Sequence, residues 1–113
     1  MSLKQKNVNE AKPVEAIPGI FRRTLAYNDA SMLCHFTLKK GAEIPLHHHV
    51  PTQIGYVVSG RARFIGATEA DAFEVGPGDS YLMPSNVPHG AIALEDTVFI
   101  EVFCPSRPEY QDF

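Results

Sequence analysis

The sequence has few cysteines and no long hydrophobic run, and both scarcities exclude classes of protein. Its 113 residues include only Cys34 and Cys104, and neither lies in a CxxC pair or in the Cys/His spacing of a zinc ribbon. We therefore predict two free thiols, both packing residues, and no disulfide framework. No apolar run approaches the roughly 20 residues that span a bilayer, and the start, MSLKQKNVNEAKP, lacks the apolar core of a signal peptide. We expect a cytoplasmic protein without a membrane partner.

Positive charge is also scarce. Ten basic residues face thirteen acidic ones, and the basic residues are scattered instead of forming a stripe that follows phosphates. This distribution argues against nucleic acid as a partner. The length and the ordinary apolar and charged fractions fit one domain. Because a barrel of this size often gains further burial by dimerising, we expect a homodimer.

No segment shows the 3.6-residue period of an amphipathic helix, and the chain has no internal repeats. Residues 1–18 are polar, with two prolines and no sustained period, so we predict an N-terminal arm followed by a barrel domain over residues 19–113. From there short β-like runs alternate with turn residues, namely FRRTLAY, SMLCHFTL, QIGYVVS, RARFI, AFEV, SYLM, HGAIAL and TVFIEVF. Many short strands with Gly and Pro turns predict an all-β antiparallel sandwich or closed barrel.

Histidines are concentrated beside two of the predicted turns. His47 and His49 are two apart on an extended stretch, so their side chains share one face while His48 points away. Gln53 follows a Val-Pro-Thr corner that can turn its carbonyl oxygen back to the same point, and His89 follows a Pro-rich turn. Three nitrogens and one oxygen suit one divalent transition metal ion (Ni, Zn, Fe, Mn or Co) with positions open for water or substrate. Three consecutive histidines also occur in solvated loops and tags, but the mid-chain context here favours the metal site.

These residues resemble the two sequence motifs of the cupin superfamily. The positions that fit the spacing of these motifs are Gly41, His47, His49, Gln53 and Gly60 in the first and Gly78, Pro84 and His89 in the second. The resemblance spans roughly residues 30–104 and implies a single-domain jelly-roll β-barrel of six to eight strands with the metal inside. Three positions depart from the motifs, because Gln53 stands where Glu is usual, Asn86 where Gly is usual and Ala93 where Asn is usual. A neutral amide leaves a bound ion a stronger Lewis acid, which makes redox chemistry with dioxygen less favoured.

Within the cupins, the chain is similar to the small KdgF-type cupins of pectin and alginate breakdown. The similarity lies in LAYNDASMLCHFTLKKGA, LHHHVPTQIGYVVSG, GDSYLMPSNVPHGAIALED and VFIEVFCPSRPEY. It implies conversion of 4,5-unsaturated monouronates, the products of polysaccharide lyases, from the cyclic to the linear keto form. It also implies that Glu101, Phe103 and Arg107 serve this sugar-acid substrate, with Glu101 standing where the family typically has Asp.

The alternation in TVFIEVF gives separate support for a role of Glu101. Period-2 geometry puts Glu101 on one face with Thr97, Phe99 and Phe103, while the other face is wholly aliphatic. If the aliphatic face packs between sheets or at an interface, Glu101 projects into the cavity as a general base, Phe103 stacks on the sugar ring and Arg107 pairs with the uronate carboxylate. If the opposite face lines the cavity, Glu101 is a solvated outer residue and Arg107 a surface charge.

The sequence leaves three functions open. The protein is a uronate ring-opening enzyme, a metal-dependent dioxygenase or other small cupin enzyme, or a non-catalytic small-molecule-binding module, because a fold alone does not decide function. We assign no role to the remaining strand arginines and tyrosines, which we place on the surface or rim of the barrel; they are Tyr56, Arg61, Arg63 and Tyr81.

Overall fold

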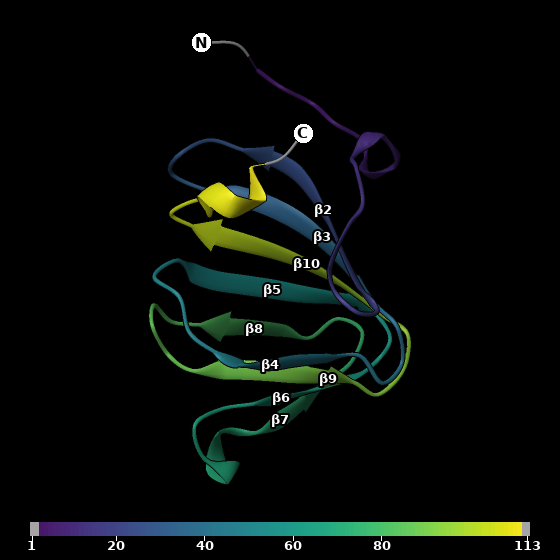
Figure 1. Ribbon diagram of the computed structural model, residues 1–113, viewed down its shortest axis with the longest axis vertical. Helices are drawn as coiled ribbons and strands as arrows, with labels where there is room; N and C mark the ends of the chain where they lie inside the picture. Colours follow the sequence, from purple (N-terminus) through teal and green to yellow (C-terminus); the bar gives the residue numbers. More distant parts are fainter. Residues whose placement is uncertain (1–2, 112–113) are drawn as a thin grey trace.

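The computed structural model describes residues 3–111, which form two antiparallel β-sheets (Figure 1). Within these residues there are ten strands, which are β1 (Val14–Ile17), β2 (Ile20–Tyr27), β3 (Met32–Leu38), β4 (Glu43–His47), β5 (Thr52–Ser59), β6 (Ala62–Ile65), β7 (Phe73–Val75), β8 (Ser80–Met83), β9 (His89–Ala93) and β10 (Thr97–Cys104). Three short 3-10 helices accompany them, η1 (Val8–Glu10), η2 (Glu69–Asp71) and η3 (Pro108–Tyr110). Over the same residues, no helix has the length and apolar character needed to cross a membrane. The predicted all-β jelly-roll fold is confirmed.

Strand β10 lies inside the larger sheet, where it joins segments that are far apart in the chain. The larger sheet has the order β1-β2-β3-β10-β5-β8 and the smaller one the order β4-β9-β6-β7. Figure 1 shows β10 between β3 and β5, with which it pairs antiparallel. The expected count of six to eight strands is too low, because the short strands β1 and β7 each add an edge to a sheet.

The side-chain alternation of β10 decides which way Glu101 faces. The buried residues of this strand are Thr97, Phe99, Glu101 and Phe103. The aliphatic residues between them are partly exposed. The aliphatic face of β10 is therefore its outer face, and Glu101 points into the barrel, as the first of the two sequence alternatives required.

Aromatic rings join the two sheets across the core. Phe64 of β6 lies with its ring centroid 5.6 Å from that of Phe99 on β10 and 4.5 Å from that of Tyr81 on β8. Such pairs bury large apolar areas and add about 0.5–1.5 kcal/mol beyond burial. They fix the spacing of the sheets on one side of the interior.

The segment predicted as a polar arm contains a strand. β1 pairs antiparallel with β2, with Val14 opposite Arg22 and Ile17 opposite Ile20. Only four residues form this edge strand, and so short a run shows no sustained period in the sequence. The larger sheet therefore begins before the predicted domain boundary at residue 18. For the residues that precede β1, a separate N-terminal arm remains a prediction.

The two cysteines are free thiols, as predicted. Cys34 is buried, but Cys104 is exposed, so the prediction of two packing residues is wrong for Cys104. In β10, Cys104 follows the inward-facing Phe103 and therefore points outward. Burial raises the pKa of the Cys34 thiol to about 11.

We expect these two thiols to react at very different rates in the native protein. At about pH 8, a thiol with a pKa of about 11 is ionised in roughly one molecule in a thousand, and the thiolate is the nucleophile. Dithionitrobenzoate will therefore titrate Cys104 at once and Cys34 only when denaturant is added. The control is Cys104→Ser, which should not react until it unfolds; rapid reaction of this native variant would contradict the burial of Cys34.

Candidate metal centre

Three histidine side chains converge at one side of the interior. His47 ends β4 and lies opposite His89, the first residue of β9, with ring centroids 4.5 Å apart. His49 follows two residues after His47, and one ligand nitrogen from each of the three rings lies within 4.8 Å of the others. His48, between them, is exposed. Pairing of β4 with β9 thus brings the two histidine segments of the sequence together.

Each of the three rings is anchored by a backbone carbonyl. The Nδ1 atoms of His47, His49 and His89 lie 2.9, 2.8 and 2.9 Å from the carbonyl oxygens of Pro45, Pro51 and Val87, respectively. A carbonyl oxygen only accepts, so Nδ1 carries the hydrogen and donates in each ring. In the neutral imidazole this leaves the lone pair on Nε2, which is the arrangement of histidines that ligate metals.

The turn before β9 connects the two histidine segments through the backbone. Val87 N–H donates to the Pro84 carbonyl over 3.1 Å, and Asn86 N–H donates to the His49 carbonyl over 2.8 Å. Asn86 has a φ of 61°, a left-handed conformation that Gly favours and that Asn tolerates better than most residues. Asn86 therefore maintains the turn that positions His89, although the cupin motif usually has Gly at this position.

His89 offers a lone pair that nothing in the described part of the chain satisfies. Its Nε2 is buried and has no hydrogen-bond partner there. Burial lowers the pKa of His89 to about 4, so the ring is uncharged at neutral pH. Buried polar atoms normally have a partner, and a metal ion is the partner that suits an imidazole lone pair.

Gln53, on β5, turns its amide oxygen toward the same place. Its Nε2 donates to Oε2 of Glu101 over 2.6 Å, which leaves its Oε1 3.1 Å from Nε2 of His49. Both atoms of that second pair are acceptors, because His49 carries its hydrogen on Nδ1. A second proton on His49 is opposed by burial, which lowers the pKa of this ring. A cation bound by both atoms removes the repulsion, so three Nε2 atoms and one amide oxygen fit a divalent metal ion.

Glu101 is a buried carboxyl group that lies next to these four donor atoms, bonded to Gln53. Its Oε2 accepts hydrogen bonds from the Tyr81 hydroxyl and from Nε2 of Gln53. Burial raises the pKa of Glu101 to about 7, although the same two hydrogen bonds oppose the rise. Two donors occupy the two lone-pair sites of Oε2, so a proton on this group sits on Oε1.

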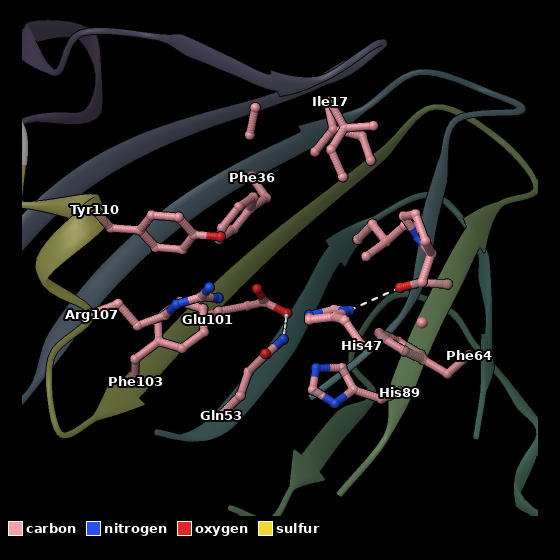
Figure 2. A pocket seen from close by; sticks show the side chains of 16 residues that line it. Ile17, Phe36, His47, Gln53, Phe64, His89, Glu101, Phe103, Arg107 and Tyr110 are labelled. Atoms are coloured by element: carbon pink, nitrogen blue, oxygen red, sulfur yellow. Dashed lines mark hydrogen bonds between the residues drawn. The ribbon is translucent and has the colours of Figure 1, made fainter. Parts of the chain in front are cut away.

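A partly open cavity of about 270 Å³ connects these groups. Figure 2 shows Glu101 between Arg107 on one side and His47 on the other, with Ile17 and Phe64 on the walls. Most of the remaining lining is apolar. Cavities for drug-sized ligands measure about 300–1,000 Å³, so this one suits a molecule of a single ring.

Arg107 closes one end of the cavity as part of a stack of rings. Its guanidinium carbon lies 4.2 Å from the ring centroid of Tyr110 and 5.3 Å from that of Phe103. Its Nε donates to Glu109 over 2.7 Å, which leaves the two terminal nitrogens for a ligand. Arg22 lies over the Tyr110 ring as well, also at 4.2 Å. Stacking on a ring fixes the orientation of a planar guanidinium group, which favours its recognition of a carboxylate.

The residues singled out in the sequence lie in one region. Those lining the cavity are His47, Gln53, His89, Glu101, Phe103 and Arg107. His49 contacts this group through Gln53 and through the Phe103 ring, whose centroid is 5.9 Å from its own. Their roles in binding and catalysis remain predictions.

Sequence reasoning missed two tyrosines at this site. Tyr110 lines the cavity from η3. Tyr81, which we placed on the surface or rim, is instead 6% exposed and bonds to Glu101, so that placement is wrong. The available signal was Gly55 inside a strand, since a glycine there often marks the close approach of another group.

Two sheets around one small cavity, with three histidines and a glutamine whose donor atoms fit a metal ion, define a small β-barrel. The model of the cupin domain family matches residues 34–103, and the chain belongs to this family. No curated protein sequence matches the chain.

Several solved structures are similar over nearly the whole chain. An RmlC-like cupin from Shewanella frigidimarina NCIMB 400 is 27% identical, with a TM-score of 0.88 and coverage of 96% of each chain. KdgF from Halomonas sp. is 32% identical, with a TM-score of 0.85 and coverage of 96% of this chain and 98% of that one. The oxalate decarboxylase OxdC of Bacillus subtilis, which has Mn(II) centres, is 26% identical with a TM-score of 0.83; the match covers 100% of this chain and 32% of that one.

Proposed function

We propose that the protein is a metal-dependent enzyme that converts 4,5-unsaturated monouronates to their linear keto form. The observation that carries this proposal is the bond between Glu101 and Gln53, because it puts a proton-transfer group beside the metal donor set in a cavity of one-ring size. The similarity to KdgF from Halomonas sp. supports the choice of substrate. Lyase products of this kind have one carboxylate, hydroxyl groups and one sugar ring.

The reaction needs one bond to break and one proton to move. The hemiacetal bond between C1 and the ring oxygen breaks as the C1 hydroxyl loses its proton to form a carbonyl. The released C5 enolate becomes a ketone as C4 gains that proton. We assign this transfer to Oε1 of Glu101, the carboxyl oxygen that Tyr81 and Gln53 leave unoccupied. When bound by Nε2 of His47, His49 and His89 and Oε1 of Gln53, a divalent metal ion supplies Lewis-acid polarisation of the substrate oxygens.

Substrate orientation comes from the opposite end of the cavity. The terminal nitrogens of Arg107 pair with the uronate carboxylate, in the bidentate geometry that a planar guanidinium offers. Phe103 is 1% exposed, and its ring supports Arg107 while giving an apolar surface to one face of the sugar. The carboxylate at one end and the metal donors at the other fix the ring across Glu101.

Arg107→Met is expected to raise KM about 10–100-fold with a smaller change in kcat, because a hydrogen-bonded charge pair contributes about 1.5–3 kcal/mol to binding. Methionine keeps an unbranched side chain against Tyr110 but removes the charge. The control is Arg61→Ala, which removes a surface arginine paired with Glu74 at 3.0 Å. Steady-state kinetics of both variants check this, and an unchanged KM for Arg107→Met would remove Arg107 from the substrate site.

The proposed activity is tested with freshly lyase-generated unsaturated galacturonate. Ultraviolet absorbance of the enol-ether double bond is followed with protein loaded in turn with Ni, Zn, Fe, Mn or Co, and with chelator-treated protein. Decay faster than the spontaneous reaction, and lost with chelator, is the expected result. A trace equal to the spontaneous one with every metal would overturn the proposal.

A second candidate is a metal-dependent dioxygenase acting on a less polar ring. The observation that favours it is the apolar wall of the cavity, formed by Ile17, Ile20, Phe36, Ile44 and Phe64. A sugar acid, with its hydroxyl groups and its carboxylate, makes little use of such a wall. Oxygen consumption by the Fe(II)-loaded protein in the presence of small aromatic or enol substrates would identify this function.

A further inference from the structure

Tyr81 lies directly behind the cavity wall, in a position that only a glycine opposite it permits. It pairs across β8 and β5 with Gly55, and a Cβ atom at position 55 would overlap the tyrosine ring. The ring also packs on Phe64 and Phe99, with centroids 4.5 and 5.6 Å away. Because these contacts fix the orientation of the Tyr81 ring, its hydroxyl group lies against Glu101.

The Tyr81 hydroxyl fixes one oxygen of that carboxyl. Burial and the neighbouring Glu101 raise the pKa of Tyr81 far above its usual range, so the hydroxyl keeps its proton and donates it to Oε2. Nε2 of Gln53 donates to the same oxygen. Two donors from different directions set both the position and the plane of the carboxyl group.

The fixed carboxyl in turn decides which way the Gln53 amide faces. With Nε2 bonded to Glu101, Oε1 must face Nε2 of His49, 3.1 Å away. An amide can also turn over by half a rotation. That flip would direct the amide hydrogens at a bound cation and remove an oxygen ligand. The positive charge of the ion makes this orientation of the amide strongly unfavourable.

We infer that Tyr81 is a positioning residue for the metal centre, acting through Glu101 to hold the oxygen of Gln53 in the ligand position. This inference rests on the metal part of the proposed function and is independent of the substrate. It extends the site to a residue that touches neither the ion nor the cavity. Mutation of a residue that supports a metal ligand typically changes metal affinity by about 10–100-fold. Glu101 contacts the ligand Gln53 directly, whereas Tyr81 contacts Glu101.

The test is the Co(II) affinity of Tyr81→Phe, measured by competition with a chromophoric chelator, together with the visible spectrum of the bound Co(II). Phenylalanine keeps the ring and its packing, so we expect wild-type thermal unfolding, an affinity about tenfold weaker and an altered cobalt spectrum. The matched control is Tyr56→Phe, a tyrosine 50% exposed on the outer side of β5, which should change neither. An unchanged affinity and spectrum in folded Tyr81→Phe would overturn the inference.

A double-mutant cycle separates transmission through Glu101 from a general loosening of the core. Glu101→Leu breaks the connection between Tyr81 and Gln53, so adding Tyr81→Phe to it should weaken Co(II) binding no further. Additive losses would overturn the inference, and so would a wild-type protein that binds no Co(II), which would also remove the metal part of the proposed function. Failure of the uronate assay alongside the expected cobalt results would reject only the substrate.

Discussion

His89→Ala is expected to leave the protein folded but without its metal ion. The Nε2 of His89 is buried with no hydrogen-bond partner among the described residues, so the substitution breaks the Nδ1 bond to the Val87 carbonyl but no bond of Nε2. We therefore expect a modest loss of stability in the metal-free fold. Metal binding instead loses one of its three nitrogens. Because even supporting residues change affinity by about 10–100-fold, loss of a ligand should lower affinity by more than that and bring metal-dependent turnover to background.

The neighbouring histidine provides the matched control for this prediction. His48 is exposed and lies between two of the proposed ligands, so His48→Ala changes the same tri-histidine segment without removing a donor. Metal content after dialysis, measured by mass spectrometry, should be one ion per chain for wild type and His48→Ala and none for His89→Ala. Full metal content in His89→Ala, or its loss in His48→Ala, would contradict the proposed site.

Glu101→Gln is expected to lower kcat for unsaturated galacturonate by about 10²–10⁴, the range for loss of a general acid-base group. The amide oxygen of the new glutamine still accepts from Tyr81 and Gln53, so metal content should stay at the wild-type level. Kinetics and metal content measured on the same sample thus separate proton transfer from ligand positioning. Full activity in a metal-loaded Glu101→Gln would remove Glu101 from the chemistry and leave it as a support for Gln53.

The matched variant for this experiment is Glu101→Asp. Aspartate keeps the carboxyl group but shortens the side chain by one methylene, and it is the residue that KdgF-type cupins typically have at this position. We expect it to retain more activity than Glu101→Gln. Equal loss in both would mean that the reach of the side chain matters as much as its proton.

The sequence predicted the strands well where burial alternates over a long run. TVFIEVF became β10, with every second residue buried, because a strand between two others has one face in the core along its whole length. β1 was missed since its four residues pair only at a sheet edge. Local sequence cannot tell such a strand from an extended arm.

The convergence of the candidate metal ligands was predictable because these residues are local to two turns. His47, His49 and Gln53 lie within one short segment, and the His89 turn has its own pattern. Tyr81 was missed because its approach to Glu101 depends on the sheet order β10-β5-β8, which brings together residues 20 positions apart in the chain. No spacing in the sequence encodes that order, so the support of Glu101 needed the structure.

The most direct test of the metal centre is the anomalous diffraction of crystals grown with Ni(II) or Co(II). We predict one ion per chain, bound by Nε2 of His47, His49 and His89 and by Oε1 of Gln53 at about 2.0–2.2 Å, as is usual for nitrogen and oxygen ligands. The Gln53 amide nitrogen should remain bonded to Glu101. An ion bound through Nδ1 atoms, an ion elsewhere on the chain, or a Gln53 amide turned away from the ion would contradict the account.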